Sequence, residues 1–249
     1  MLIALIFSLL CGGLVGLLLW YLFRKMPTHW LLEYGESEIP PELRAIQQAP
    51  WWPDAILLML AGGTLASLAW LRRPHGLDLI IFGASAALLL LILVADWKTL
   101  IIPDPLTFGL MALAGLKAAW LLVSGGISLG GLLGRFLAGL SAAALFLLIG
   151  WIGEKLAGQE ALGMGDVKLI AACVWLVGYE KAPSLVFLSF VSASVIALPM
   201  LVRKYTAKGP DRPADALPFG PFIALATILV QVLEPELNKL WSLYLGQFQ

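Results

Sequence analysis

Residues 79–95, LIIFGASAALLLLILVA, contain no charged side chain and are followed directly by Asp96. An apolar run of about 17 to 25 residues is long enough to cross the roughly 30 Å hydrocarbon core of a bilayer as one helix. The run therefore predicts a membrane-spanning helix that ends at Asp96. Ionisable residues at membrane depth are costly and are usually functional, so Asp96 is the first candidate for a functional residue.

Further apolar runs of the same kind lie on both sides of this stretch. They cover residues 2–22, 55–71, 106–123, 132–152, 167–179, 184–202 and 217–233. The composition agrees, because mean hydropathy is +0.91 and 13% of the 249 residues are charged, too few to coat a soluble protein of this size. The sequence predicts an all-α polytopic membrane protein with about eight transmembrane helices. The run 167–179 is short, and it is either a spanning helix or a re-entrant segment.

The distribution of basic residues predicts the orientation of these helices. Arg24 and Lys25 follow the first run, which places the N-terminus outside and the first loop in the cytoplasm. Carried through eight spans, this topology puts most of the loop lysines and arginines in the cytoplasm, with the pair at 72 and 73 as an exception. Asp96 and the start of the run 167–179 then lie on the same, cytoplasmic side.

A second candidate aspartate lies at that start, in residues 160–169, EALGMGDVKL. Asp166 follows Gly163 and Gly165, and glycine permits unusual backbone angles and close approach of another chain. Two carboxylates that approach each other can share one proton, activate water and protonate a leaving amine. A helix N-terminus favours an ionised Asp166, and a helix C-terminus favours a protonated Asp96, so Asp166 is the expected base.

The residues alone leave other interpretations of these aspartates open. Asp166 has the position of a helix cap, which is a common role of aspartate. A pair of carboxylates in a membrane would equally serve a small transporter that uses Asp96 and Asp166 as proton or cation sites. A transporter is therefore the alternative function.

Several classes of function are disfavoured. The 16 basic and 16 acidic residues cancel, which leaves no electrostatic case for nucleic-acid binding. The two histidines, His29 and His75, lie in predicted loops, and the sequence has no His-Glu-x-x-His motif. The two cysteines, Cys11 and Cys173, lie in apolar runs and cannot supply a four-ligand zinc site. No metal site is predicted.

Some other residues have predicted structural roles. Asp104 precedes Pro105, which predicts a helix N-cap with proline at the first helical position. Lys117 and Arg135 lie within or beside predicted helix ends, and their side chains are expected to reach the membrane interface. The spacing Gly12-x-x-x-Gly16 permits close helix packing, but in a glycine-rich chain we give it little weight. Residues 25–52 are expected to form an interfacial loop.

Three segments together resemble the motifs of the type IV prepilin peptidases, a family of membrane aspartyl proteases. They are residues 95–107 (ADWKTLIIPDPLT), 163–166 (GMGD) and 217–222 (LPFGPF), in the family's order and with apolar spans between them. The resemblance covers about residues 55–235. It implies catalytic roles for Asp96 and Asp166. Gly163 and Gly165 match the motif glycines, and Lys168 matches a lysine that commonly follows the motif aspartate.

The resemblance implies an endopeptidase of the bacterial inner membrane whose active site faces the cytoplasm. Its partners would be type IV prepilins or type II secretion pseudopilins, whose leader it removes, and the lipid bilayer, with no nucleic acid. The expected division is residues 1–54, a first transmembrane helix and a short cytoplasmic loop, and residues 55–249, a transmembrane peptidase domain.

The first loop departs from the family pattern. Many members carry two Cys-x-x-Cys pairs there, which are associated with zinc and with N-methylation of the cleaved pilin, whereas residues 25–52 contain no cysteine. The expectation is proteolysis without a metal or cofactor. S-adenosylmethionine is expected only if methyl transfer is retained, and this second activity is left open.

Overall fold

The computed structural model describes residues 2–32, 40–48, 51–72, 76–158, 162–206 and 217–246. Within these ranges the regular structure is helical and no strand occurs, which confirms the all-α class. The α-helices are α1 (Leu2–Lys25), α2 (Pro41–Gln47), α3 (Ile56–Arg72), α4 (Leu77–Thr99), α5 (Asp104–Val123), α6 (Leu129–Ala157), α7 (Met164–Val177), α8 (Ala182–Thr206), α9 (Gly220–Val232) and α10 (Glu234–Gly246). A 3-10 turn, η1 (Thr28–Leu31), and a π-helical turn, η2 (Trp51–Ala55), lie between α1 and α3.

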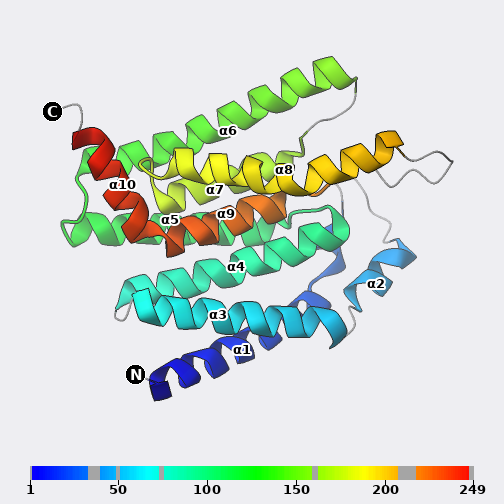
Figure 1. Ribbon diagram of the computed structural model, residues 1–249, viewed down its shortest axis with the longest axis horizontal. Helices are drawn as coiled ribbons and strands as arrows, with labels where there is room; N and C mark the ends of the chain where they lie inside the picture. Colours follow the sequence, from blue (N-terminus) through cyan, green and yellow to red (C-terminus); the bar gives the residue numbers. More distant parts are fainter. Residues whose placement is uncertain are drawn as a thin grey trace.

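The long helices run back and forth, side by side, in one bundle (Figure 1). Six of the described helices, α1, α3, α4, α5, α6 and α8, are long and apolar enough to cross a membrane. The two other predicted spans correspond to α7, with 14 residues, and α9, with 13 residues, or about 21 and 20 Å at 1.5 Å per residue. About eight spans is therefore compatible with the structure, although two of them are short.

The short helices α7 and α9 lie inside the bundle. Most of their side chains are buried, and α7 packs against α5, α6 and α9, while α9 packs against α4 and α8. Because protein surrounds them, their length need not match the thickness of the lipid core. α7 begins with the segment that contains Asp166.

A tight reversal joins α4 to α5 and sets the position of Asp96. Leu100 takes the left-handed conformation (φ 58°), and its N–H donates to the Asp96 carbonyl at 2.8 Å, which closes the last turn of α4. Pro103 is then the N-cap of α5, and Asp104 lies in its first turn. The predicted N-cap role of Asp104 is wrong by one position, because Pro103 already has the extended backbone that a cap requires.

Glycines bring α1 and α3 into direct backbone contact. A Cβ on Gly12 would overlap the Gly62 carbonyl, and a Cβ on Gly16 would overlap the backbone at Leu58. The low weight given to the Gly12-x-x-x-Gly16 spacing is therefore wrong, since both glycines are needed for the approach of these two helices.

The described parts of residues 25–52 form short helices rather than an extended interfacial loop. In the parts that the structure describes, η1 and α2 bury Leu31 and Leu43 in the same core as α4 and α7. The Gln47 side-chain amide donates to the Met26 carbonyl at 2.8 Å, which ties α2 to the end of α1. This first loop therefore packs onto the bundle.

Two basic side chains expected at the interface contact the C-terminal end of α7 instead. Lys117 is only 7% exposed, and its ammonium donates to the Leu176 carbonyl at 3.2 Å. The Arg135 guanidinium lies against Gly178, where a Cβ would be 2.8 Å from Nη1. Cations at a helix C-terminus are stabilised by the unpaired carbonyls and the helix dipole, and this interaction outweighs their contact with the interface.

The helix α10 was not predicted from hydropathy, because charged and polar residues interrupt its apolar ones and leave no run long enough to span a membrane. Two ion pairs attach it to the bundle, Arg72 with Glu236 at 2.6 Å and Lys181 with Glu234. The hydrogen bond from Arg72 holds the pKa of Glu236 below its usual range. In Figure 1, α10 lies at the end of the bundle opposite α2.

Candidate active site

Asp96 lies in the last turn of α4 with its carboxylate directed into the bundle. The side chain is 4% exposed, and the backbone N–H of Gly220, the first residue of α9, hydrogen-bonds to it. Its Oδ2 atom is buried and has no hydrogen-bond partner within the described ranges. A Cβ on Gly220 would lie 2.5 Å from this oxygen, so glycine is required for α9 to begin so close to Asp96.

Asp166 lies in the first turn of α7, behind the extended Gly163. The backbone N–H of Gly163 hydrogen-bonds to the Asp166 carboxylate, and a Cβ on Gly163 would be 3.6 Å from Oδ2. The other oxygen, Oδ1, is buried and has no partner among the residues that the structure places. The Asp96 and Asp166 carboxylates are close enough for their charges to repel each other. The structure therefore brings together the two predicted catalytic carboxylates.

One apolar side chain connects the three motif segments. Ile102, in the α4–α5 reversal, lies 3.1 Å from the position of a Cβ on Gly165 and 2.9 Å from that of a Cβ on Gly220. Gly165 therefore makes room for Ile102, and Ile102 in turn packs beside Asp96. Sequence reasoning singled out neither Ile102 nor Gly220, although both lie inside motif segments whose order along the chain was recognised.

Three helix N-termini and one C-terminus converge at the aspartates. α5, α7 and α9 begin here and α4 ends here, at the end of the bundle where α2 also lies (Figure 1). The N-terminus of a helix carries a partial positive charge and favours nearby anions. Asp96 was expected to experience only the C-terminus of its own helix, yet the N-terminal amide of α9 also faces it. The assignment of Asp166 as the base stays a prediction.

An ion pair flanks each candidate aspartate. Lys98, two residues after Asp96, pairs with Asp54 of η2 at 2.8 Å. Lys168, two residues after Asp166, pairs with Asp104 in the first turn of α5. The carboxylate of Asp104, which the sequence suggested as a cap, is therefore engaged with the lysine of the GMGDVK segment.

Aromatic packing fixes the start of α9. The Phe219 ring packs against Phe146 of α6 at 5.9 Å between centroids, Phe190 of α8 at 5.3 Å and Phe222 at 6.4 Å. Tilted ring contacts of this kind stabilise an arrangement beyond the area they bury. The cluster holds Gly220 in place against Asp96.

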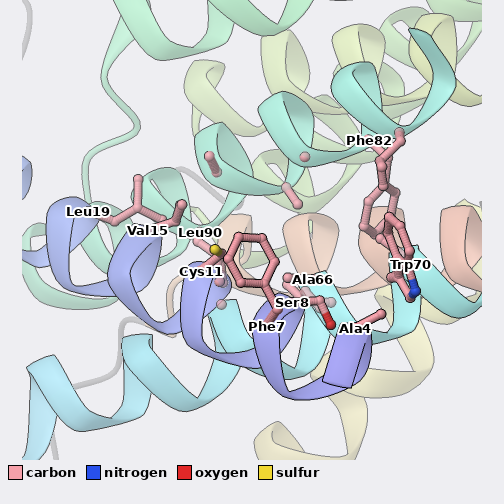
Figure 2. Close-up of a pocket in the computed structure, with 18 residues that line it drawn as sticks. Ala4, Phe7, Ser8, Cys11, Val15, Leu19, Ala66, Trp70, Phe82 and Leu90 are labelled. Carbon is pink, nitrogen blue, oxygen red and sulfur yellow. The ribbon is translucent and has the colours of Figure 1, made fainter. Parts of the chain in front are cut away.

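An apolar cavity of about 370 Å³ lies elsewhere, between α1, α3 and α4 (Figure 2). On α4 it is lined by Gly83, Ala86 and Leu90. On α4 the lining ends at Leu90, more than one helical turn before Asp96, and it includes no residue of the three motif segments. The cavity is therefore not part of the aspartate site.

Part of the chain that contains the site is similar to known proteins. The family described as type IV leader peptidase matches residues 79–198, which contain both aspartates. A prepilin leader peptidase/N-methyltransferase of Pectobacterium carotovorum is 30% identical over 209 residues, 82% of this chain and 67% of the relative. The chain belongs to the type IV leader peptidase family.

Two other relatives in this family carry similar names. A prepilin leader peptidase/N-methyltransferase of Burkholderia pseudomallei (strain K96243) is 36% identical over 173 residues, 68% of this chain and 51% of the relative. A type 4 prepilin-like proteins leader peptide-processing enzyme of Escherichia coli O78:H11 is 32% identical over 185 residues, 73% of this chain and 62% of the relative. The chain spans about half the length of the first of these. No solved structure matches it.

A metal ion and S-adenosylmethionine would each require particular binding groups among the described residues. Within the described ranges, no three His, Cys, Asp or Glu side chains lie close enough to hold a metal ion. The cavity in Figure 2 is lined by apolar side chains apart from Ser8 and Cys11, so it offers no charge to the amino and carboxylate groups of S-adenosylmethionine. This cavity therefore does not fit the cofactor.

Proposed function

We propose that the chain is a membrane aspartyl endopeptidase that cleaves the leader of type IV prepilins or type II secretion pseudopilins. The observation that carries this proposal is the meeting of Asp96 and Asp166, each with one buried oxygen that lacks a partner among the described residues. The names of the relatives support the substrate class. A helix cap alone would not require a second carboxylate at the same place.

The geometry suits general acid–base hydrolysis of a peptide bond. One aspartate, here assigned as Asp166, accepts a proton from water while the resulting hydroxide attacks the scissile carbonyl carbon. Asp96, in its protonated form, first donates a hydrogen bond to the carbonyl oxygen and then gives its proton to the leaving nitrogen. The products are a carboxylic acid and an amine, and one proton remains on the pair at the end.

Gly163, Gly165 and Lys168 have supporting roles in this proposal. Gly163 donates its backbone N–H to Asp166, and Gly165 accommodates Ile102 at the meeting point of the motif segments. Lys168 attaches the start of α7 to the start of α5 through Asp104. The peptidase domain is assigned to residues 55–249, and residues 1–54 are assigned to the additional first helix and loop.

The orientation assigned to the site is cytoplasmic. Basic residues gather at the end of the bundle where the aspartates lie, among them Arg24 and Lys25 at the end of α1 and Arg44 in α2. Such an excess of positive charge is typical of the cytoplasmic side of bacterial inner-membrane proteins. A substrate whose leader stays in the cytoplasm would present its scissile bond at this level.

Cleavage of a prepilin tests the function directly. Wild-type protein is co-expressed with a candidate prepilin, and cleavage is read as a mobility shift on a gel. Asp96→Asn and Asp166→Asn should each reduce the rate by about 10²-fold to 10⁴-fold, because an amide cannot exchange the required proton. Both variants should still insert in the membrane.

The result also separates the two candidate functions. Full cleavage by either asparagine variant would refute the assignment of these carboxylates. Absence of cleavage by the wild type, together with aspartate-dependent uptake of protons into vesicles, would favour the transporter.

A further inference from the structure

The cavity between α1, α3 and α4 is a groove that opens to the surface of the bundle. Its floor is buried, since Leu19 of α1 is 3% exposed and Leu90 of α4 is 7% exposed. Its rim is exposed, with Phe7 at 67% and Val15 at 44%. At Gly83, also on the groove, no atom lies within 4 Å of the position of a Cβ. The side chains that line this space therefore neither seal it nor fill it.

The groove runs along the helices and begins near one end of the bundle. Figure 2 shows Leu19 at one end of the labelled residues and Trp70 at the other. On α4 the lining extends from Leu79, the third residue of the helix, to Leu90, which is about 16 Å at 1.5 Å per residue. One leaflet accounts for half of the roughly 30 Å hydrocarbon core, or about 15 Å. The groove therefore has the length of one leaflet and lies in the half of α4 away from the aspartates.

The walls of the groove suit an apolar occupant. None of the described residues that line it is charged. The Ser8 hydroxyl on the wall already donates to the Leu5 carbonyl at 2.9 Å. Apolar cavities exclude water and bind apolar molecules, and walls that face an empty space lose their dispersion contacts. At this depth in a bilayer, the apolar groups that reach an exposed rim are lipid chains.

The volume of the groove distinguishes a single hydrocarbon chain from a helix. A helix of the same length, about 10 Å across, fills roughly 1,200 Å³. The groove holds about 370 Å³, so a partner helix could insert only some of its side chains. A hydrocarbon chain is much thinner than a helix and can lie in the groove along its whole length.

We propose that this groove is a binding site for one acyl chain of a phospholipid from the leaflet at the end of the bundle opposite the aspartates. The chain lies against α4 on one side and against the paired helices α1 and α3 on the other. Its headgroup stays at the level where α3 ends at Arg72 and α4 begins at Leu77. The site is separate from the proposed peptidase chemistry and does not rest on it.

Native mass spectrometry of the detergent-purified protein, supplied with palmitoyl-oleoyl phosphatidylethanolamine, tests the site. The wild type should retain one phospholipid molecule per chain. Gly83→Leu should lower the retained fraction about tenfold or more, because the new side chain takes the space of several methylene groups of the lipid. Gly83→Ala adds a single methyl group and should retain the lipid. If the leucine variant does not fold, Ala87→Leu narrows the same groove.

A matched control makes the same change on another helix. Gly130 of α6 is exposed, and a Cβ there would meet the Ser128 Oγ at 3.6 Å. Gly130→Leu should therefore retain the lipid as the wild type does. A wild type without bound phospholipid, or equal retention by the two leucine variants, would overturn the proposal. A wild-type dimer that Gly83→Leu dissociates would identify a second copy of the chain as the occupant and would also overturn it.

Photo-crosslinking in liposomes locates the chain independently. The probe is a phosphatidylethanolamine that carries a diazirine at the middle of one acyl chain, and the labelled peptides are identified by mass spectrometry. Labels should concentrate at groove residues such as Val15 and Gly83, and Gly83→Leu should remove this preference. Leu137 of α6 and Phe187 of α8 are also exposed and serve as the reference surface. Equal labelling of the groove and of this reference surface would show ordinary contact with the bilayer and would reject the site.

Discussion

At the scale of single residues, the site is defined by two carboxylate oxygens, Asp96 Oδ2 and Asp166 Oδ1, that are buried without a hydrogen-bond partner within the described ranges. More than nine in ten buried polar groups in proteins are hydrogen-bonded, and an unsatisfied one costs about 1–3 kcal/mol. Two unpaired carboxylate oxygens in one site indicate a functional role more strongly than either aspartate alone. In the proposed reaction, these two oxygens are the atoms that would contact the scissile peptide group and its attacking water.

Asp104 gives a test of the division of roles between the aspartates. Asp104→Asn should lower cleavage about tenfold or less, because the asparagine keeps the shape of the side chain while the charge that pairs with Lys168 is lost. The comparison is with Asp96→Asn in the same gel assay. Complete loss of cleavage in Asp104→Asn, with cleavage retained in Asp96→Asn, would reverse the assignment.

Gly220 tests whether the contact between α9 and Asp96 matters for catalysis. Gly220→Ala places a Cβ 2.5 Å from Asp96 Oδ2 and 2.9 Å from Ile102 Cδ1, so the carboxylate must move. Displacement of a catalytic group by about 1 Å typically costs on the order of 100-fold in rate. Gly83→Ala is the matched control, because no atom lies within 4 Å of its added Cβ. Equal cleavage by the two variants would show that the contact has no catalytic role.

At the scale of elements, the reversal between α4 and α5 does much of the positioning. Only residues 100–103 separate the two helices, so Asp96 and Asp104 are held at one end of the bundle. α7 carries the second aspartate, Asp166, and Gly220 at the start of α9 supplies the amide that hydrogen-bonds to Asp96. α9 begins at Gly220, where a Cβ would lie 2.5 Å from Asp96 Oδ2 and would prevent the approach. α7 begins directly after Gly163, where a Cβ would make only ordinary contact with Asp166 Oδ2 at 3.6 Å.

The contact between α1 and α3 provides a prediction about stability. Gly12→Ala places a Cβ 2.5 Å from the Ala66 Cβ and in overlap with the Gly62 backbone, and such overpacking typically costs about 1–3 kcal/mol. The thermal unfolding midpoint of the detergent-solubilised protein should fall by several degrees. Gly13→Ala should not lower it, because its Cβ would meet only the Met59 carbonyl at 3.7 Å. Equal midpoints for the two variants would contradict the described packing.

At the scale of the whole molecule, hydropathy was sufficient to locate the helices of the bundle. Residues 79–95 became α4 and residues 167–179 became most of α7, because lipid requires apolar side chains and paired backbone groups. α10 was missed because its apolar residues form no run of spanning length. The family motifs located Asp96 and Asp166, and the topology correctly placed both at one end of the bundle.

Contacts between distant residues could not be predicted from the pattern. Ser85 of α4 donates to the Gln231 side chain of α9 at 3.2 Å, yet neither residue interrupts its apolar run enough to attract attention. Lys117 was assigned to the interface because hydropathy treats every lysine alike, whereas the Leu176 carbonyl binds it inside the bundle. Such hydrogen bonds depend on which helices lie side by side. The periodicity of apolar residues does not give that information.

The presence or absence of methyl transfer is a property of the whole protein. Polar residues of the first loop such as Glu33 and Glu36 lie outside the described residues. Mature pilin produced with this chain should have an unmodified N-terminal amine, because the first loop lacks the cysteines and the described cavity does not fit the cofactor. Mass spectrometry of the mature pilin N-terminus checks this. A mass gain of one methylene group would establish the second activity.

The position of the aspartates along the helices has a consequence for the supply of water. Hydrolysis consumes water, and the hydrocarbon layer of a bilayer, roughly 30 Å thick, excludes it. α7 and α9 begin at the aspartates, where the longer α5 also begins and α4 ends, and the Leu176 carbonyl near the end of α7 binds Lys117, six residues before the end of α5. The short helices therefore fall short at the end of the bundle away from Asp96 and Asp166. The proposed hydrolysis would then draw its water from the near side of the bundle and not through its length.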